Sequence, residues 1–317
     1  MKTDPYSDLN DGSRPRTIRS IYILVSFLIL VLLFSKIPFS DIIRTVSHAN
    51  GTFLVLALLV SLFNTGCVAT ERWRRILHAM GCAISFRETL CIRGSVLSLE
   101  FFLPFRLGEI VKAAYLKRCH GFAIELALSS VLFEKTLSLW ACLAVFILGM
   151  GFVILKFPVI IFVLAFGLIC LCIFEKRVWL GLQHFTYRVC PSIQGIVSKL
   201  VRAFESISFQ DKVILCGYSL IIQVLEVLLI YLLALAVDVH LPLLVLPALG
   251  ALVVLASSIP ITFMGAGARE LSILVVFALY APKEALLSLG LLTTMVGAVL
   301  PRLLGGIFWG EFINVKS

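Results

Sequence analysis

Charged residues are scarce in this sequence, making up 14% of its 317 residues, whereas hydrophobic residues make up 60%. A soluble domain fills its core with far less apolar sequence, so the composition excludes an ordinary soluble enzyme or binding module. The mean hydropathy of +1.06 indicates a chain that crosses a membrane several times. Because helices satisfy their own backbone hydrogen bonds within a bilayer, we predict an all-α, polytopic membrane helix bundle.

Motifs that bind nucleotides or carry catalysis are also missing. No G-x-x-x-x-G-K-S/T loop is present, which argues against direct use of ATP. The five histidines lie in scattered loops, and the nine cysteines form no C-x-x-C pair, so the sequence indicates neither a zinc site nor a disulfide framework. Most cysteines are expected to pack as small hydrophobic side chains, with Cys190 in a polar loop as the exception. We expect no enzyme activity, no metal and no cofactor.

Six apolar runs are long enough to cross a bilayer, since about twenty residues at about 1.5 Å each reach about 30 Å. They cover residues 18–37, 52–70, 124–149, 152–174, 213–237 and 285–309. A secretory signal is the alternative for the first run, but residues 35–38 offer no small-x-small cleavage site, so we expect an uncleaved span. Residues 1–17 are then a cytoplasmic tail, and residues 18–317 form a single transmembrane domain.

The basic residues predict the orientation of the chain. When loops are assigned alternately to the two sides, 19 basic residues fall on the side of the tail and four on the other. Cytoplasmic loops collect Lys and Arg, so both termini are expected on the cytoplasmic side of the cytoplasmic membrane. Residues 71–75, Glu-Arg-Trp-Arg-Arg, are interpreted as the cytoplasmic end of the second span, with Trp73 at the interface. The net charge of +9 is attributed to topology and contact with anionic lipid, not to nucleic acid.

Residues 175–212 form the longest polar interval, and apolar residues recur there at helical spacing after Pro191. This pattern predicts an amphipathic helix on the cytoplasmic membrane surface. A helix packed on the transport core is the alternative.

Two stretches, residues 89–118 and 242–281, are apolar but broken in the middle. The first break is Leu103-Pro104 followed by Gly108-Glu109, and the second is Ile259-Pro260 followed by Gly265, Gly267 and Arg269-Glu270. Each predicts a re-entrant helical hairpin, and the expected topology makes the two enter from opposite faces. Opposed half-helices aim positive N-termini at an anion, for which phosphate is the natural candidate.

Nine charged residues in these two stretches and in the predicted spans are candidates for a substrate site: Arg106, Glu109, Arg269, Glu270, Glu134, Lys135, Glu226, Glu100 and Arg302. Capping of a helix start is the alternative for Glu109 and Glu270. The arginines beside these two favour a site, because an unpaired charge in apolar surroundings costs a few kcal/mol or more. Buried ion pairs or packing polar groups are the alternative for the 134–135 pair and for Glu226.

Glu226 lies near the middle of its apolar run, with Gln223 and Ser219 on the same helical face. An acid at that depth must face protein or water. Residues 64–66, Asn-Thr-Gly, are predicted instead to be helix-packing contacts.

Four motifs carry a resemblance to a known family. They are Glu71-Arg72-Trp73-Arg74-Arg75, Leu103 through Glu109, Phe133-Glu134-Lys135, and Pro260 through Glu270. They resemble the motifs of the transmembrane domain of lysylphosphatidylglycerol synthases, whose stand-alone members are called flippase-like membrane proteins, and the resemblance covers roughly residues 15–312. It implies lipid translocation, since synthase relatives flip an aminoacylated phospholipid and others are linked to polyprenyl-phosphate-sugar or glycolipid pathways.

Two features depart from the synthase pattern. We expect the soluble aminoacyl-transferring domain of the synthases to be missing after Ser317, so the resemblance does not imply synthase activity. Lys135 stands where arginine is common in the family. We therefore expect a flippase or scramblase for a phosphate-bearing lipid: a phospholipid, a glycolipid or a polyprenyl-phosphate-linked lipid. The alternatives are a secondary transporter of a soluble anion and a membrane enzyme acting on lipid-linked substrates. Expected partners are the lipid, lipid-synthesising membrane enzymes and further copies of the chain.

Overall fold

The computed structural model describes residues 44, 46–100, 108–155, 207–258 and 265–310. The predicted tail, the predicted first span and residues 156–206 lie outside this part of the chain, and with them most of the fourth predicted span and most of the predicted amphipathic segment. Across the described residues the regular structure is helical and contains no strand, which confirms the all-α prediction.

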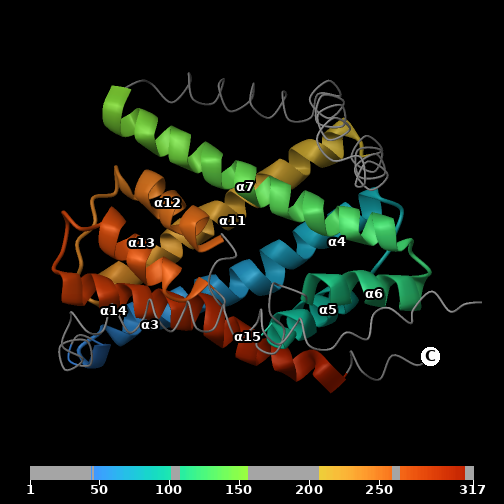
Figure 1. Ribbon diagram of the computed structural model, residues 1–317, viewed down its shortest axis with the longest axis horizontal. Helices are drawn as coiled ribbons and strands as arrows, with labels where there is room; N and C mark the ends of the chain where they lie inside the picture. The colour runs from blue at the N-terminus through green and yellow to red at the C-terminus, as the bar shows by residue number, and fades with distance from the viewer. Residues whose placement is uncertain (1–43, 45, 101–107, 156–206, 259–264, 311–317) are drawn as a thin grey trace, which may run out of the picture.

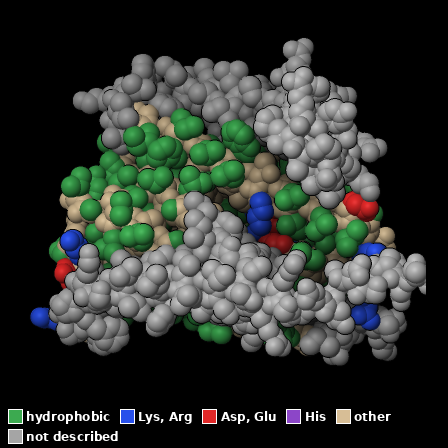
Figure 2. Space-filling view, viewed as in Figure 1, with side chains coloured by type: hydrophobic (Ala, Val, Ile, Leu, Met, Phe, Trp, Pro, Cys, Tyr) green, Lys and Arg blue, Asp and Glu red, His purple; other side chains and the backbone are tan. Residues whose placement is uncertain are grey.

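In the described part of the chain, four helices are long and apolar enough to cross a membrane: Gly51–Ala79, Ile124–Gly151, Phe209–Ala236 and Lys283–Phe308. They correspond to four of the six runs predicted to span, and Figure 1 shows them running between the same two ends of the molecule. Large apolar side chains such as Val55, Leu59 and Val224 are exposed on them, and hydrophobic side chains cover much of the face drawn in Figure 2. An apolar outer surface of this kind suits contact with lipid.

Two of the spans are composite. The first consists of α3 (Gly51–Phe63), the π-helix η2 (Asn64–Val68) and α4 (Ala69–Ala79). The last consists of α14 (Lys283–Thr294), the π-helix η6 (Met295–Val299), α15 (Leu300–Gly305) and the 3-10 turn η7 (Gly306–Phe308). The two composite spans meet near their π-helices, where Ser61 Oγ donates to the Val296 carbonyl at 2.9 Å. A π-helix inside an α-helix often marks a functional site.

Between the spans lie two pairs of short helices. The first pair is α5 (Phe86–Leu99) with α6 (Gly108–His120), and the second is α12 (Leu246–Ser258) with α13 (Ala268–Val276). The longest of these has 14 residues, which reach about 21 Å and fall short of a bilayer core of about 30 Å. The pairs lie at opposite ends of the bundle (Figure 1), which we call the α5–α6 end and the α12–α13 end. Entry of either pair into the membrane stays a prediction.

Local sequence explains where several of these helices begin. Ser85 Oγ accepts from the Glu88 amide at the start of α5, and Ser208 Oγ accepts from the Asp211 amide at the start of α11 (Phe209–Ala236). At the start of α13, Gly267 has a φ of 85° and its amide donates to Glu270 Oε2 at 2.6 Å. A glycine is needed there because other residues rarely adopt positive φ.

The same order of elements, a span, a pair of short helices and a span, occurs twice in the chain. The first set ends in α7 (Ile124–Leu155), and the second ends in the composite span of α14 and α15. The sets interlock, because the first short helix of each packs on the last span of the other. A methyl group added at Gly149 of α7 would collide with the backbone of Ala248 on α12, and one at Gly305 of α15 would collide with Gly94 on α5.

The contact at Gly149 gives a direct test of this interlocking. We expect Gly149→Ala to lower the melting temperature of the purified protein, because overpacking a close backbone crossing costs about 1–3 kcal/mol. Gly217→Ala on α11 is the matched control, since nothing lies within 4 Å of the added methyl group. It should gain helix propensity and melt at the parent temperature or above. Equal stability of Gly149→Ala and the control would show that α7 and α12 do not approach closely.

The structure corrects three predicted boundaries. The second span does not end at residue 70 but continues through α4, and α7 continues to Leu155 past the predicted break at residue 150. Residues 209–212 belong to α11 and not to the amphipathic segment. Helices run on through charged residues where those charges find buried partners, as Arg72 does.

Candidate functional site

Glu134 of α7 lies at the centre of a buried charge network. Its Oε1 accepts from Arg93 Nη1 of α5 at 2.7 Å and from Arg72 Nη2 of α4 at 3.2 Å. The other terminal nitrogen of Arg72, Nη1, donates to Ser138 Oγ at 3.0 Å and to Ser219 Oγ at 3.1 Å. The network therefore joins α4, α5, α7 and α11 at one depth.

Two lysines extend this network. Lys112 Nζ lies 2.6 Å from Glu109 Oε2 and 3.8 Å from Glu134 Oε2, and it sits 5.1 Å from the centroid of the Trp73 ring. Lys135 Nζ lies 2.7 Å from Glu109 Oε1. We call the four cations Arg72, Arg93, Lys112 and Lys135, with Glu109 and Glu134, the basic cluster.

The basic cluster holds more positive than negative charge. It contains four cations and two carboxylates, and Arg72, Arg93 and Lys112 are all less than 10% exposed. The Nε atoms of Arg72 and Arg93 are buried and donate to nothing in the described part of the chain. Buried cations are costly unless paired, so an excess of two charges favours an anion at this place.

A central cavity of about 490 Å³ opens beside the basic cluster. Arg72, Arg93, Glu134 and Lys135 line it, and so do residues of α11, α13 and both π-helices. Figure 2 shows basic and acidic side chains together in a recess among hydrophobic side chains near the middle of the molecule. The volume falls within the range of pockets that bind small polar ligands or headgroups, about 300–1,000 Å³.

The face of α11 leads from the basic cluster along the cavity. Ser219, Gln223 and Glu226 lie on successive turns of this face, which confirms the predicted helical offset. Ser219 contacts Arg72, Gln223 lines the cavity, and Glu226 accepts from Asn64 Nδ2 of η2 at 3.1 Å. Seven residues of helix span about 10 Å, so the cavity is long enough to hold more than one polar group.

Towards the α12–α13 end the cavity is lined by Arg269 of α13. Arg269 Nη1 donates to Thr294 Oγ1 at 3.2 Å, and Thr294 Oγ1 donates to Glu270 Oε1 at 2.7 Å. Glu270 also caps its own helix through the Gly267 amide. The prediction that Glu270 begins a helix is confirmed, and its carboxylate lies behind Arg269 instead of lining the cavity.

Arg302 of α15 also reaches the cavity. Its Nη2 and Nε donate to Glu100 Oε2 at 2.9 and 3.2 Å, and its Nη1 donates to the Ala298 carbonyl in η6 at 3.0 Å. The pair joins the end of α5 to α15, and Ser98 Oγ donates to the Arg302 carbonyl beside it.

The predicted site residues fall into three groups. Five of them line the central cavity: Glu134, Lys135, Glu226, Arg269 and Arg302. Three do not line the cavity: Glu100 and Glu109 pair with the cavity residues Arg302 and Lys135, and Glu270 caps the start of α13. Arg106 lies outside the described residues. Their role in binding a substrate stays a prediction.

The sequence analysis missed three members of the basic cluster. Arg72 was assigned to the membrane interface together with Trp73, but both are buried, and Trp73 Nε1 donates to Ser130 Oγ at 3.3 Å. Arg93 and Lys112 lie in the interrupted stretch 89–118 but are not among its predicted site residues. One signal was available, because Arg72 shares a helical face with apolar Ala69 and Ile76, whereas its basic neighbours do not.

The prediction that residues 64–66 are helix-packing contacts holds for Asn64, which is 5% exposed and contacts α11 through Glu226. Asn64 and Thr65 also line the central cavity, which the prediction did not include. Gly66 makes no close contact, because an added methyl group there would meet nothing within 4 Å.

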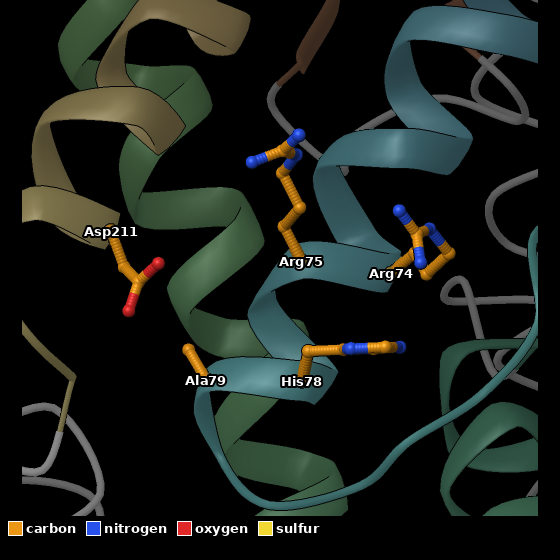
Figure 3. Close-up of a pocket in the computed structure, with 5 residues that line it drawn as sticks. All are labelled: Arg74, Arg75, His78, Ala79 and Asp211. Carbon is orange, nitrogen blue, oxygen red and sulfur yellow. The ribbon is translucent and has the colours of Figure 1, made fainter.

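A second pocket of about 400 Å³ lies between α4 and α11, lined by Arg74, Arg75, His78, Ala79 and Asp211 (Figure 3). Its polar groups already have partners. Glu71 accepts from both arginines, His78 Nε2 lies 2.9 Å from the Ile84 carbonyl, and Ser208 Oγ donates to Asp211 at 2.6 Å. The central cavity is therefore the candidate site.

The cysteines of the described ranges are free thiols. Several are buried, as predicted for packing residues, and burial raises the pKa of the Cys82 thiol. Within those ranges no group of three or more His, Cys, Asp and Glu side chains is placed to hold a metal ion.

The fold and the cavity define a helical membrane protein that crosses the bilayer several times and encloses a buried, basic cavity. The chain belongs to the family described as the lysylphosphatidylglycerol synthase TM region, which matches residues 20–305. It is also similar to "UPF0104 membrane protein MJ1595" from Methanocaldococcus jannaschii. The two are 21% identical over an alignment 317 positions long, which covers 92% of this chain and 94% of the relative. The resemblance seen in the sequence motifs is therefore confirmed at the level of the family.

Proposed function

We propose that this protein moves a lipid with an anionic, phosphate-bearing headgroup across the cytoplasmic membrane. The observation that carries the proposal is the excess of two positive charges in the basic cluster, beside a cavity within a bundle of spans. The headgroup would sit in the central cavity, where the unpaired Nε atoms of Arg72 and Arg93 and the ammonium of Lys135 favour phosphate oxygens. The acyl chains would stay in the bilayer. The family of synthase transmembrane regions supports this proposal.

The proposed topology has six crossings, with α5–α6 and α12–α13 as re-entrant pairs from opposite faces and both termini in the cytoplasm. Three of the basic residues that indicated this orientation, Arg72, Arg93 and Lys112, are buried in the cluster. The remaining loop residues still favour the same side. As proposed, the protein carries out no covalent chemistry on the lipid, and its partners are the lipid, lipid-synthesising membrane enzymes and further copies of the chain.

The test is lipid translocation in vesicles that contain the purified protein. We expect labelled anionic phospholipid or polyprenyl-phosphate lipid to cross the bilayer at least about tenfold faster than in protein-free vesicles, and faster than a zwitterionic lipid. Uptake of glycerol 3-phosphate by the same vesicles distinguishes the soluble-anion alternative. If no phosphate-bearing lipid crosses faster than in protein-free vesicles while the soluble anion accumulates, the lipid proposal is wrong.

A further inference from the structure

Glu226 is an acidic side chain near the middle of the spanning helix α11, and it lines the central cavity. A carboxylate at that depth is costly, and acids retained there commonly lie on proton or ion pathways. The basic cluster is built without Glu226, so its presence in the cavity calls for a separate explanation.

The other carboxylates around the cavity each have a charged or capping partner. They are Glu100, Glu109, Glu134 and Glu270. Among the described residues, Glu226 instead accepts one hydrogen bond, from the neutral amide of Asn64, and has no cation within ion-pair distance. Its negative charge is therefore the least compensated at short range.

Asn64 provides a second, independent observation. Its side chain is 5% exposed, and its Oδ1 accepts no hydrogen bond from the described residues while its Nδ2 donates to Glu226. A carboxyl and a carboxamide side by side can form two hydrogen bonds, amide N–H to acid oxygen and acid O–H to amide oxygen. The second bond requires a protonated carboxyl group. A protonated Glu226 would therefore have a donor to offer the unsatisfied Asn64 Oδ1, which an ionised Glu226 lacks.

The charged side chains around Glu226 determine how its protonation would affect the binding of an anion in the cavity. Arg269 on α13 and Arg302 on α15 act on it electrostatically. The other charged residues of the cavity wall are Arg72 on α4, Arg93 on α5, and Glu134 and Lys135 on α7, whereas α12 and η2 contribute the uncharged Ser257, Ser258, Asn64 and Thr65. An ionised Glu226 repels a phosphate group that enters the cavity. A neutral Glu226 removes this repulsion and leaves the positive charge of the cavity wall to the phosphate.

We infer that Glu226 takes up one proton when an anionic headgroup enters the central cavity and releases it when the headgroup leaves, which couples lipid movement to the proton gradient. The proton comes from water on the side of entry, binds a Glu226 carboxylate oxygen, and returns to water on the other side. This inference rests on the proposed function and supplies its energy source.

The test compares the parent, Glu226→Gln and Glu71→Gln in vesicles with and without an imposed pH gradient. We expect the parent and Glu71→Gln to move anionic lipid several-fold faster when the side of entry is acidic. In Glu226→Gln the ratio of the two rates should fall to about one, whatever rate remains. A parent rate that ignores the gradient, or a Glu226→Gln variant that still follows it, overturns the coupling.

A binding measurement decides the inference if lipid movement is too slow to compare. Glycerol 3-phosphate is titrated into the purified protein in buffers that differ in ionisation enthalpy, which reports protons taken up per anion bound. We expect uptake of about one proton in the parent and near zero in Glu226→Gln, with thermal melting to verify that both are folded. Binding without proton uptake, or no binding by the folded parent, rejects the inference. Parent vesicles that match protein-free vesicles instead reject the proposed function alone.

Discussion

Replacing Glu134 with glutamine is expected to destabilise the protein by about 3–5 kcal/mol, the loss that follows when one partner of a buried ion pair is removed. Glu134 is 4% exposed in its side chain and accepts from both Arg72 and Arg93. Without its charge, the four cations of the basic cluster, three of them buried, face one carboxylate, Glu109. The helices that carry these cations, α4, α5, α6 and α7, would then repel one another.

The sequence offers a matched control in Glu71, which also accepts from two arginines, Arg74 at 2.6 Å and Arg75 at 2.9 Å. Its side chain is 18% exposed and its arginines are more exposed still. Partly exposed pairs contribute about 0–1 kcal/mol, so Glu71→Gln should melt close to the parent. Thermal unfolding in detergent, followed for both variants, checks the difference. If the two melt together, the network around Glu134 is not the buried centre of the fold.

A double substitution separates charge imbalance from loss of shape. We expect Glu134→Gln combined with Arg93→Gln to recover part of the stability lost in Glu134→Gln alone, because one uncompensated cation is removed with its partner. Residues in one network show coupling of about 0.5–3 kcal/mol in such cycles. Strictly additive losses would mean that the two side chains do not interact in the folded protein.

The sequence alone was sufficient for the four spans in the described part of the chain, because their information is local. An apolar run of about twenty residues has few alternatives to a membrane helix. The two interrupted stretches were recognisable from the proline, glycine and charged residues within them. Glu270 at the start of α13 and the polar face of α11 were predictable for the same reason, since capping and helical offset depend on neighbours in the chain.

The basic cluster was not predictable in this way, because it is made of residues far apart in the sequence. Arg72 stands in a run with Arg74 and Arg75, and the three differ only in the helix face they occupy. Arg93 and Lys112 lie in the interrupted stretch 89–118, in which only Glu100, Arg106 and Glu109 were predicted as site residues. Positive charge was read as topology, although part of it neutralises buried carboxylates. To tell basic residues that set the orientation from those that pair with buried carboxylates, one must know which helices meet. This depends on contacts between distant parts of the chain, such as that of Gly149 with Ala248.

Lys135→Met is expected to slow movement of anionic lipid by about tenfold or more with little loss of stability. The Lys135 side chain is 43% exposed and lines the cavity, while Glu109 keeps a second partner in Lys112. A hydrogen bond to a charged group contributes about 1.5–3 kcal/mol, and each 1.4 kcal/mol changes binding by about tenfold. The ammonium of Lys135 is therefore available to a headgroup, unlike the buried cations that also hold the helices together.

Two further variants make the result specific to charge at this position. Lys135→Arg keeps a cation at the cavity wall and should move anionic lipid at a rate near that of the parent. Lys283→Met, at the first residue of α14 and away from the cavity lining, removes the same charge elsewhere and should have no effect. The measurement is the translocation rate of anionic against zwitterionic lipid, with melting temperature recorded for each variant. If Lys135→Met folds and still moves anionic lipid at the parent rate, the headgroup does not bind at the basic cluster. Arg269, at the α12–α13 end of the cavity, would then be the next residue to test.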